Sequence, residues 1–245
     1  MKAIILAAGL GSRLKHVTHD KPKALVEVGG ITMLESVILK LKSQGINELL
    51  INIHHFGQSI IDFLDTRNNF GVNITISDER DLLMDTGGAI LKAKKFILGN
   101  EPVLVHNVDV ISNVNIKELL ALHTERKSMA TLCVRRRDSQ RGLLFNNNNL
   151  LIGWTNLGDK KYRWVNHSYT DYSLFAFSGI YLINPDFVDH ITQTGVFSII
   201  DTWLDIAKNH PISGYIDTSS IWHDLGTMDK ICDAEKKLNS REKIS

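Results

Sequence analysis

The residues best suited to chemistry begin with a glycine-rich stretch near the start of the chain, residues 6–14 with the sequence LAAGLGSRL. It continues the apolar run of residues 2–8, which predicts a strand buried on both faces. In open α/β sheets ligands bind beyond the carboxyl ends of the strands, where glycines let backbone N–H groups approach phosphate oxygens. Arg13 adds a planar guanidinium that suits a phosphate. The stretch is therefore a candidate phosphate-binding turn.

Two other glycine-rich phosphate sites are disfavoured by what the sequence lacks. A dinucleotide-binding motif would need a third glycine at position 14, which is leucine, and an acidic residue at the end of the second predicted strand. That strand ends instead in Asn52, Ile53 and His54. A Walker loop would need a Gly-Lys-Ser/Thr ending, which is absent. A glycine turn with a purely structural role stays open at this point.

Lysines and carboxylates elsewhere in the chain can complete such a site. Lys23 lies beside Pro22, which holds the backbone extended, and it stands ten residues after Arg13, so it can return to the same phosphates. Asp109 follows a predicted strand at 102–106, and Asp224 ends a short one at 221–224. We expect both carboxylates at the same sheet edge, although a helix or turn cap is an alternative role for each.

These residues must be positioned by a regular alternation of strands and helices in the first half of the chain. Thr32 and Glu35 form a plausible capping box for one of the helices. Such alternation argues for a parallel sheet with right-handed crossovers. Strands are predicted at 2–8, 48–53, 72–77, 102–106 and 129–134, and helices at 32–43, 58–64, 88–98 and 116–126.

The pattern changes after about residue 135, where antiparallel structure is predicted. Residues 142–154 indicate a hairpin with an asparagine turn. Residues 159–171 show no clear period and predict a loop, either over a site or simply on the surface. Further strands are expected at 173–183, 212–217 and 221–224, and helices at 185–192, 198–209 and 228–239. The simplest prediction is one domain over residues 1–245, with a nucleotide-binding half at 1–135 and a closing half at 136–245.

Composition narrows the class of protein. The 245 residues are 43% hydrophobic and 22% charged, with 28 basic and 27 acidic groups, a balance typical of a soluble globular protein and not of a nucleic-acid binder. Cys133 and Cys232 have no second cysteine nearby and are expected to be reduced thiols. No apolar run approaches the length of about 20 residues that spans a bilayer. We therefore expect a cytoplasmic protein without nucleic-acid or membrane partners.

The motifs taken together resemble those of the sugar-1-phosphate nucleotidyltransferases, over nearly the whole chain. The stretch of residues 6–25 is similar to the signature of that family, and four further motifs follow in family order. The short length is most similar to the compact bacterial branch, which includes N-acetylmuramate-1-phosphate uridylyltransferases and mannose- or heptose-1-phosphate guanylyltransferases. The four motifs are residues 85–89 (DTGGA), 107–109 (NVD), 177–181 (FSGIY) and 222–227 (WHDLGT).

The resemblance implies a fold and a reaction. The fold would be Rossmann-like, three-layer α/β/α, with a mainly parallel central sheet and an antiparallel C-terminal portion, the nucleotide-diphospho-sugar transferase fold. A sugar 1-phosphate would attack the α-phosphate of a nucleoside triphosphate, with UTP or GTP as the expected donor, and release pyrophosphate. Two anions must meet, so the protein must neutralise and align them.

The resemblance also implies the roles of individual residues. Arg13 and Lys23 would be catalytic, and Asp109 and Asp224 would hold Mg²⁺, which prefers oxygen ligands. Glu79 would read the base, although a surface acid is an alternative, and Asp85 would touch the sugar or simply cap a helix. The implied nucleotide-binding residues are Leu6, Ala8, Gly9, Gly11, Ser12, Glu79, Thr86, Gly87, Gly88 and Asn107, and the implied sugar-binding residues are Asp85, Gly142 and Gly179.

Some positions depart from the family pattern. Val108 stands where the family usually has glycine, and His16 where proline is common. No lysine of the sequence matches the one that many relatives use for the sugar phosphate, and Lys160, Lys161 and Arg163 are candidates by location alone. A non-catalytic nucleotide- or sugar-sensing subunit, suggested by Val108, and a phosphocholine cytidylyltransferase, which shares the opening turn, are the alternative functions.

Overall fold

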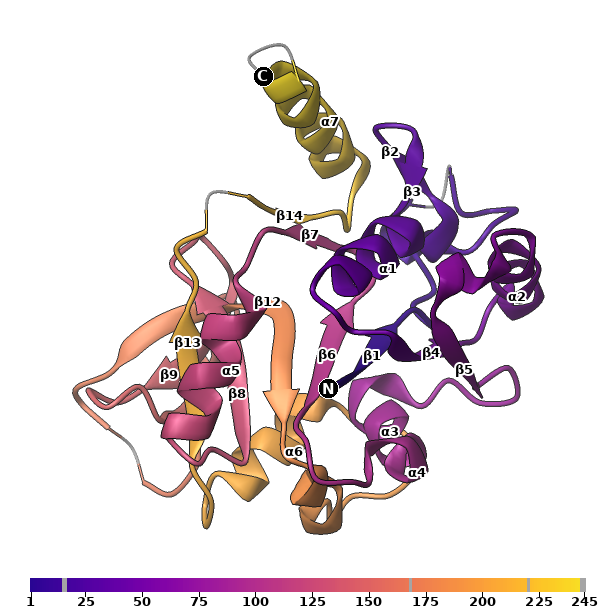
Figure 1. The fold of residues 1–245 in the computed structure, drawn as a ribbon. Helices are drawn as coiled ribbons and strands as arrows, with labels where there is room; N and C mark the ends of the chain where they lie inside the picture. The colour runs from indigo at the N-terminus through magenta and orange to yellow at the C-terminus, as the bar shows by residue number, and fades with distance from the viewer. Residues whose placement is uncertain (15–16, 168, 220, 243–245) are drawn as a thin grey trace. The chain divides into compact units, whose positions relative to one another are not determined.

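The computed structural model describes residues 1–14, 17–167, 169–219 and 221–242, so His16 lies outside the described residues. The chain forms two compact units, each built from segments distant in sequence (Figure 1). Unit 1 comprises Met1, Met84–Val105 and Val114–Ser219, and unit 2 comprises Lys2–Leu83, His106–Asn113 and Ser220–Ser245. Segments of the two units therefore alternate along the chain, whereas the halves predicted from the sequence were contiguous.

Unit 2 contains three of the five strands predicted for the parallel sheet, whereas the strand predicted at 129–134, β8 (Ala130–Arg135), lies in unit 1 and pairs antiparallel with β12 (Ser173–Ile183). The strands β1 (Lys2–Leu6), β4 (Glu48–Ile53) and β5 (Asn73–Asp78) pair in parallel, with Ala3 opposite Leu49 and Leu49 opposite Ile74. Figure 1 shows them side by side. Because β1 and β4 are almost entirely apolar and buried, their carboxyl ends are fixed by the packing of the core.

Unit 2 also contains helices and two short antiparallel pairs of strands. The helix α1 (Met33–Ser43) begins after Thr32, whose hydroxyl accepts the N–H of Glu35 at 3.1 Å, so the predicted cap is confirmed. The remaining elements are α2 (Gly57–Thr66), α7 (Met228–Glu242), the pair β2 (Glu27–Val28) and β3 (Ile31–Thr32), and the pair β7 (Val110–Ser112) and β14 (Trp222–Asp224).

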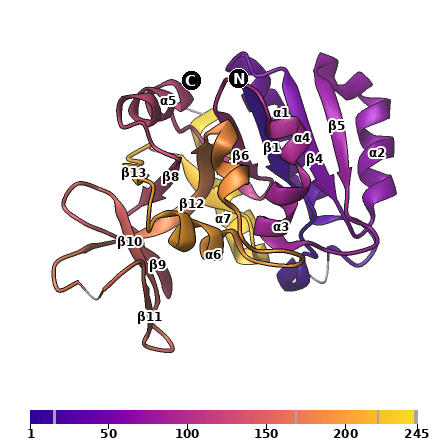
Figure 2. The ribbon, with the colours of Figure 1, turned by 90° about the horizontal axis from the view of Figure 1, so that it is seen from below.

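Unit 1 is organised around the long strand β12 (Ser173–Ile183). Antiparallel neighbours of β12 are β8 (Ala130–Arg135) and β9 (Arg141–Phe145), and β13 (Ile212–Ile216) runs parallel to β8. The hairpin predicted at 142–154 is confirmed as β9 and β10 (Leu151–Asn156), which Figure 2 shows together. The predicted antiparallel C-terminal portion is therefore confirmed.

Some predicted elements of unit 1 need correction. The loop expected at 159–171 contains a strand, β11 (Lys161–Trp164), paired with β10. The helix expected at 88–98 is two helices, α3 (Asp85–Lys92) and α4 (Lys94–Ile97), separated at Ala93, where ψ is 4°. The helix expected at 185–192 is a 3-10 helix over Pro185–His190. The other elements are α5 (Ile116–Glu125), α6 (Ile199–Ile206) and β6 (Val103–Asn107), which passes from unit 1 into unit 2.

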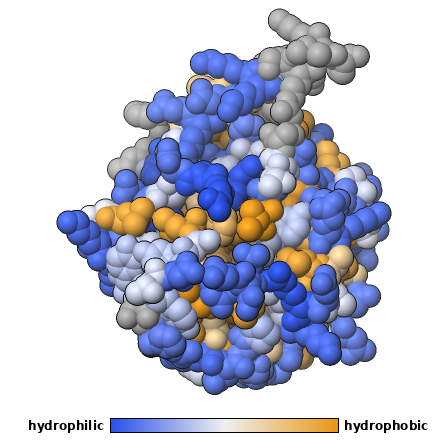
Figure 3. Space-filling model, turned by 90° about the vertical axis from the view of Figure 1, so that its left-hand side faces the viewer, coloured by the Kyte–Doolittle hydropathy of each residue, from blue (hydrophilic) through white to orange (hydrophobic). Residues whose placement is uncertain are grey.

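Each unit has its own apolar core. In unit 1, Trp203 of α6 packs edge-on against Tyr181 and Phe177 of β12, with ring centroids 5.1 and 5.0 Å apart. In unit 2, Ile4 and Ile5 of β1 and Leu34 of α1 are fully buried. The face drawn in Figure 3 is largely hydrophilic, with scattered apolar areas. Among the described helices, none has the length and apolar character needed to cross a bilayer.

Candidate active site

The glycine-rich turn is held by a buried asparagine at the end of the neighbouring strand. The side-chain oxygen of Asn52 on β4 accepts the N–H groups of Ala7 and Ala8, at 2.6 and 3.3 Å. Further along the turn, Gly11 has a φ of +63°, which a glycine adopts without strain, and its carbonyl accepts the N–H of Leu14 at 2.7 Å. The turn therefore has a fixed backbone path directly after β1.

Asn52 joins this turn to Glu79. Its amide nitrogen donates to Oε1 of Glu79 at 2.9 Å, and the two residues are 4% and 1% exposed. Glu79 is thus a buried acid and not a surface one. Asn52 was missed by the sequence analysis, although the sequence holds a signal for it, because it is a polar residue in the otherwise apolar run of residues 49–53.

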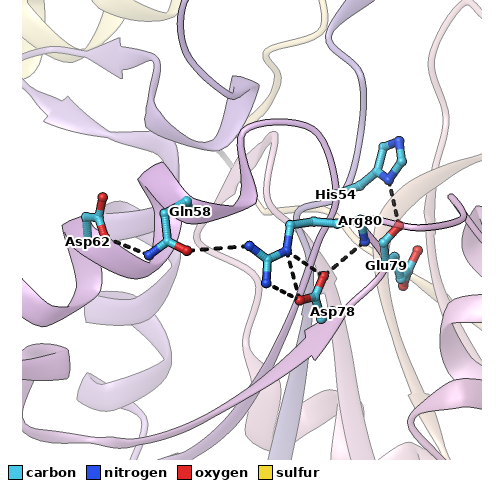
Figure 4. A network of polar contacts seen from close by, with 6 residues as sticks. All are labelled: His54, Gln58, Asp62, Asp78, Glu79 and Arg80. Atoms are coloured by element: carbon cyan, nitrogen blue, oxygen red, sulfur yellow. Dashed lines mark hydrogen bonds and ion pairs between the residues drawn. The ribbon is translucent and has the colours of Figure 1, made fainter.

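The segment that carries Glu79 is fixed by further polar contacts (Figure 4). The ring nitrogen Nδ1 of His54 lies 2.7 Å from the backbone oxygen of Glu79. Arg80 donates through Nε to both carboxylate oxygens of Asp78, at 3.0 and 2.9 Å, and through Nη1 to Gln58 of α2 at 3.4 Å. Hydrogen bonds therefore connect the end of β5 to the end of β4 and to the start of α2.

The two aspartates predicted as metal ligands are brought together in unit 2 by backbone pairing. The strands β7 and β14 are antiparallel, with Asp224 opposite Val110, and the N–H of Leu225 donates to the carbonyl of Asp109 at 2.8 Å. Asp109 itself stands beside the end of β1, because the N–H of Val108 donates to the carbonyl of Leu6 at 3.1 Å. The prediction that both aspartates lie at one edge has this physical basis.

Cationic side chains surround the two carboxylates. Lys23 forms an ion pair with Oδ2 of Asp109, and the side chain of Lys23 is 10% exposed. Lys23 also packs on the glycine turn, since a Cβ built on Gly11 would lie 3.3 Å from the Cβ of Lys23. A Cβ built on Gly226 would lie 2.9 Å from Oδ1 of Asp224 and 3.2 Å from Nη2 of Arg13. The turn, both predicted catalytic cations and both aspartates therefore gather in one part of unit 2.

Asp224 has a second cationic partner that the sequence analysis missed. Lys230, in the first turn of α7, forms an ion pair with Oδ2 of Asp224, while Oδ1 accepts the N–H of Gly226 at 3.0 Å. Burial raises the pKa of the Asp224 carboxyl, but the Lys230 contact, the Gly226 N–H and the charge of Lys23 outweigh burial and hold this pKa below its ordinary value. Asp224 is therefore a carboxylate in a cationic environment.

The remaining predicted residues around the turn differ in exposure. Gly9 and Ser12 are exposed, Ala8 is buried, and Asn107 is half-buried at the end of β6. Leu6 ends β1. Val108 is only 4% exposed, so its side chain belongs to the interior. All of them lie in unit 2, together with Arg13, Lys23 and Glu79.

The predicted nucleotide-binding residues Thr86, Gly87 and Gly88 lie in unit 1, where α3 begins. The N–H groups of both glycines point to the carbonyl of Phe197, at 2.9 and 3.3 Å, and Thr86 Oγ1 accepts the N–H of Ile199 at 3.0 Å. A Cβ built on Gly87 would lie 2.4 Å from the Phe197 ring. These contacts give the three residues a role in joining α3 to α6, in addition to the predicted contact with a base.

The predicted sugar-binding residues also lie in unit 1. Asp85 has a φ of +57°, and its Oδ1 accepts the N–H of Thr86 at 2.6 Å, so it fixes the start of α3. Gly142 on β9 packs tightly, since a Cβ there would lie 2.3 Å from Leu174 Cδ1. Gly179, with φ +81°, lies where the register of β12 against β8 shifts between Phe177 and Tyr181. Glycine at both positions is therefore explained by local geometry.

The basic residues considered for the sugar phosphate have different surroundings. Arg163 pairs with Asp201 at 2.6 Å and lies over the Trp154 ring. Lys160 is exposed in the turn before β11, and Lys161, the first residue of β11, is also exposed. Arg137, which the sequence analysis did not consider, donates to the carbonyl of Phe177 at 3.2 Å, two residues before Gly179. The sequence signal for it is the run of three arginines at 135–137.

Comparison with known proteins decides the family. A sequence model described as nucleotidyl transferase matches residues 2–143, more than half of the chain. The chain belongs to this family.

Two relatives illustrate the range of the similarity. The N-acetylmuramate alpha-1-phosphate uridylyltransferase of Caulobacter vibrioides is 40% identical over 111 residues, which cover 44% of this chain and 46% of that protein. The probable mannose-1-phosphate guanylyltransferase 1 of Oryza sativa subsp. japonica is 32% identical over 230 residues, which cover 92% of this chain and 61% of that protein. The chain thus spans about half to three-fifths of the length of these curated relatives.

Solved structures of the family share the fold. A UDP-glucose pyrophosphorylase complexed with UDP-glucose superposes with a TM-score of 0.77 at 18% identity, covering 98% of both chains. At this identity the likeness concerns the fold alone. The nucleotide-diphospho-sugar transferase fold predicted from the sequence is confirmed.

Nucleotidyl transferases generally use a divalent metal, and the donor set of this chain fits one. Among the described residues, no group of three or more His, Cys, Asp and Glu side chains could enclose a metal ion. Asp109 and Asp224 are two carboxylates on paired backbone segments. Mg²⁺ is commonly held by one or two carboxylates, and phosphates and waters supply its other ligands. Two aspartates without a third ligand therefore suit Mg²⁺ better than a metal that needs a full protein cage.

Proposed function

We propose that the protein transfers a nucleoside monophosphate from a nucleoside triphosphate to a sugar 1-phosphate and releases pyrophosphate, with Mg²⁺ as cofactor. The observation that carries the proposal is the pairing of β7 with β14, which brings the backbone of Asp109 next to that of Asp224 and Leu225, with Lys23 paired to Asp109 and Arg13 close to Gly226. An oxygen of the sugar phosphate attacks the α-phosphorus, and the bond from that phosphorus to the oxygen bridging to the β-phosphate breaks. The reaction needs cations more than it needs a base.

The residues of unit 2 have the chemistry for the triphosphate. Arg13 offers a planar fork of donors to the phosphate that leaves, and Lys23 offers an ammonium that bridges phosphate oxygens during transfer. The N–H groups of the turn around Gly9 and Gly11 add neutral donors on a backbone that Asn52 holds in place. Asp109 and Asp224 would hold Mg²⁺, which supplies charge neutralisation on the phosphate oxygens.

The base and the sugar are assigned to further residues. Glu79, buried and fastened by Asn52, is the proposed base-reading acid, together with Thr86, Gly87 and Gly88 at the start of α3 and Asn107 at the end of β6. Asp85, Gly142 and Gly179 are the proposed sugar contacts. UTP and GTP are the preferred donors, because the relatives named above are a uridylyltransferase and a guanylyltransferase. The cytoplasm is the expected compartment.

A substrate panel tests the proposal. UTP, GTP, CTP and dTTP are each incubated with the 1-phosphates of glucose, mannose, N-acetylglucosamine and N-acetylmuramic acid, with Mg²⁺ present. Pyrophosphate is measured, and the nucleotide sugar is identified by mass spectrometry. We expect one pair to react well above the others, and only when the sugar phosphate and Mg²⁺ are both present. A panel that is silent throughout, or a chain that binds a nucleotide sugar tightly without turnover, contradicts the proposal.

A further inference from the structure

Lys230 is a further cation next to Asp224. It stands in the first turn of α7, six residues after Asp224, and its ammonium pairs with Oδ2 of that aspartate. The other oxygen, Oδ1, accepts the N–H of Gly226. Both carboxylate oxygens of Asp224 are therefore engaged by the short segment that follows it.

The position of Lys230 is fixed because α7 is anchored on both sides of its first turns. Ile231 is 3% exposed and Ala234 is fully buried, so this face of the helix packs into unit 2. Glu235 accepts the N–H of Gly29, between β2 and β3, at 3.2 Å. Since the backbone at Lys230 is held next to Asp224, the ammonium of this 45% exposed side chain stays within reach of the Asp224 carboxylate.

Asp109 and Asp224 each form an ion pair with a lysine. Lys23 pairs with Asp109, Lys230 pairs with Asp224, and the charge of Lys23 also acts on Asp224. With Arg13 beside Gly226, three cations surround two carboxylates. A divalent cation that binds Asp224 must therefore share or displace an ammonium in a region already rich in positive charge.

We propose that Lys230 is a positioning residue that acts as an internal counter-ion of Asp224, competing with the bare divalent cation and favouring the cation–nucleotide complex. This inference rests on the proposed function. A bare cation would leave the displaced ammonium among Lys23 and Arg13 without an anionic partner. A cation that arrives with a triphosphate brings that partner, because phosphate oxygens can accept from the released ammonium. Lys230 thus favours binding of the cation–triphosphate complex over binding of the bare cation.

A titration of the full chain with Mn²⁺ tests this role. Electron paramagnetic resonance measures the concentration of the free ion at each step. Lys230→Met removes the charge, and Lys236→Met, an exposed lysine of the same helix, is the matched control. We expect Lys230→Met to bind bare Mn²⁺ about three- to tenfold more tightly than the wild type, and Lys236→Met to differ by less than about twofold. A merely structural lysine would give the opposite sign, because its loss would loosen the site.

A second titration uses Mn²⁺ with UTP and with GTP. Here we expect Lys230→Met to bind the complex about three- to tenfold more weakly than the wild type, and Lys230→Arg to keep the wild-type pattern in both titrations. Suppose that Lys230→Met is folded by circular dichroism and that the wild type binds Mn²⁺. If the variant then binds bare Mn²⁺ as tightly as the wild type or more weakly, the inference about Lys230 is wrong and the proposed metal site stands. A wild-type chain that binds Mn²⁺ in neither titration overturns the proposed metal site as well.

Discussion

At the scale of single residues, Asp109 has two roles, as a proposed ligand of the cation and as the partner of Lys23. Asp109→Asn keeps the shape of the side chain and removes its charge. We expect turnover on the substrate pair found by the panel to fall by at least about 100-fold, because the cation loses a ligand and Lys23 loses its orientation. Asp65→Asn, an exposed residue of α2, is the matched control. Near-normal turnover in Asp109→Asn would refute the ligand assignment.

Asn52 makes a different prediction, because its contacts are all internal. Asn52→Leu would leave the N–H groups of Ala7 and Ala8 and a carboxylate oxygen of Glu79 without the partners that they have now. A buried polar group that loses its partner costs about 1–3 kcal/mol. We expect the free energy of unfolding by urea to fall by about 2–4 kcal/mol, with little change for Asn73→Ala at the exposed start of β5. An unchanged midpoint would mean that Asn52 does not support the turn.

Single residues differ in how far the sequence reveals them. Arg13, Lys23, Asp109 and Asp224 are predicted from their motifs to share a site, and the structure places all four in one part of unit 2. Asn52 and Lys230 were missed for a common reason. Their partners are decided by which strands are neighbours and by where α7 docks, and neither follows from local pattern.

At the scale of elements, some glycines are required by the packing of the fold and others are available to a ligand. Gly87 in α3 and Gly9 in the turn after β1 illustrate the two cases. A Cβ on Gly9 would meet nothing within 4 Å, whereas a Cβ on Gly87 would lie 2.4 Å from Phe197. We expect Gly9→Ala to leave the urea midpoint unchanged and to raise the KM for the nucleoside triphosphate by about tenfold or more, since the methyl group occupies the path of approaching phosphates.

The comparison with Gly87→Ala makes this prediction specific. That substitution overpacks the contact between α3 and α6, and we expect it to destabilise the chain by about 1–3 kcal/mol. A Gly9→Ala variant that is destabilised to the same degree would assign the first glycine to folding. A Gly9→Ala variant with normal stability and normal KM would remove the turn from the phosphate site.

Elements were predicted well where the core imposes a pattern. β4 and β12 have the predicted bounds because their sequences are mostly apolar and rich in β-branched or aromatic residues, which is typical of strands that pack into a core. β11 was missed because its alternation is hidden by aromatic residues on an edge strand, where Trp164 contacts Tyr162, Tyr169 and Tyr172. β14 agrees with the strand expected at 221–224, whereas β7, which has three residues, is too short to show a period and was not predicted. The pairing of β7 with β14 nevertheless brings the backbones of the two aspartates close together.

At the scale of the whole molecule, each unit has a buried histidine in its interior, His123 in unit 1 and His106 in unit 2, and burial favours the neutral form of both. In unit 1, His123 Nε2 donates to Asn184 Oδ1 at 3.0 Å, since the Asn184 amide nitrogen is used on Ser128, and Thr131 contacts Nδ1 at 2.8 Å. In unit 2, His106 Nδ1 donates to the carbonyl of Asn107 at 2.8 Å, and its Nε2 has no hydrogen-bond partner among the described residues. Protonation of either ring would place a charge in the interior.

Acidification should therefore lower the free energy of unfolding through the buried histidine of each unit. Burial lowers the pKa of His106 to about 4 and also lowers that of His123, whereas an unfolded histidine titrates near 6.5. Below pH 6.5 the unfolded chain binds more protons than the folded one, so the free energy of unfolding falls as the pH drops from 6.5 toward 4. For His106 the loss would reach about 3 kcal/mol, at 1.36 kcal/mol for each unit of pKa.

Urea unfolding at pH 7.5, 6.0, 5.0 and 4.5 measures this dependence. His106→Gln removes the titrating ring. The free energy of unfolding should therefore fall less steeply between pH 6.5 and 4.5 in this variant than in the wild type, even if the variant is less stable at pH 7.5. His19→Gln, an exposed histidine, should leave the slope unchanged. A wild-type stability that is flat across this range would mean that the interior admits the charged ring, and the buried neutral histidine of unit 2 would then be an incorrect description.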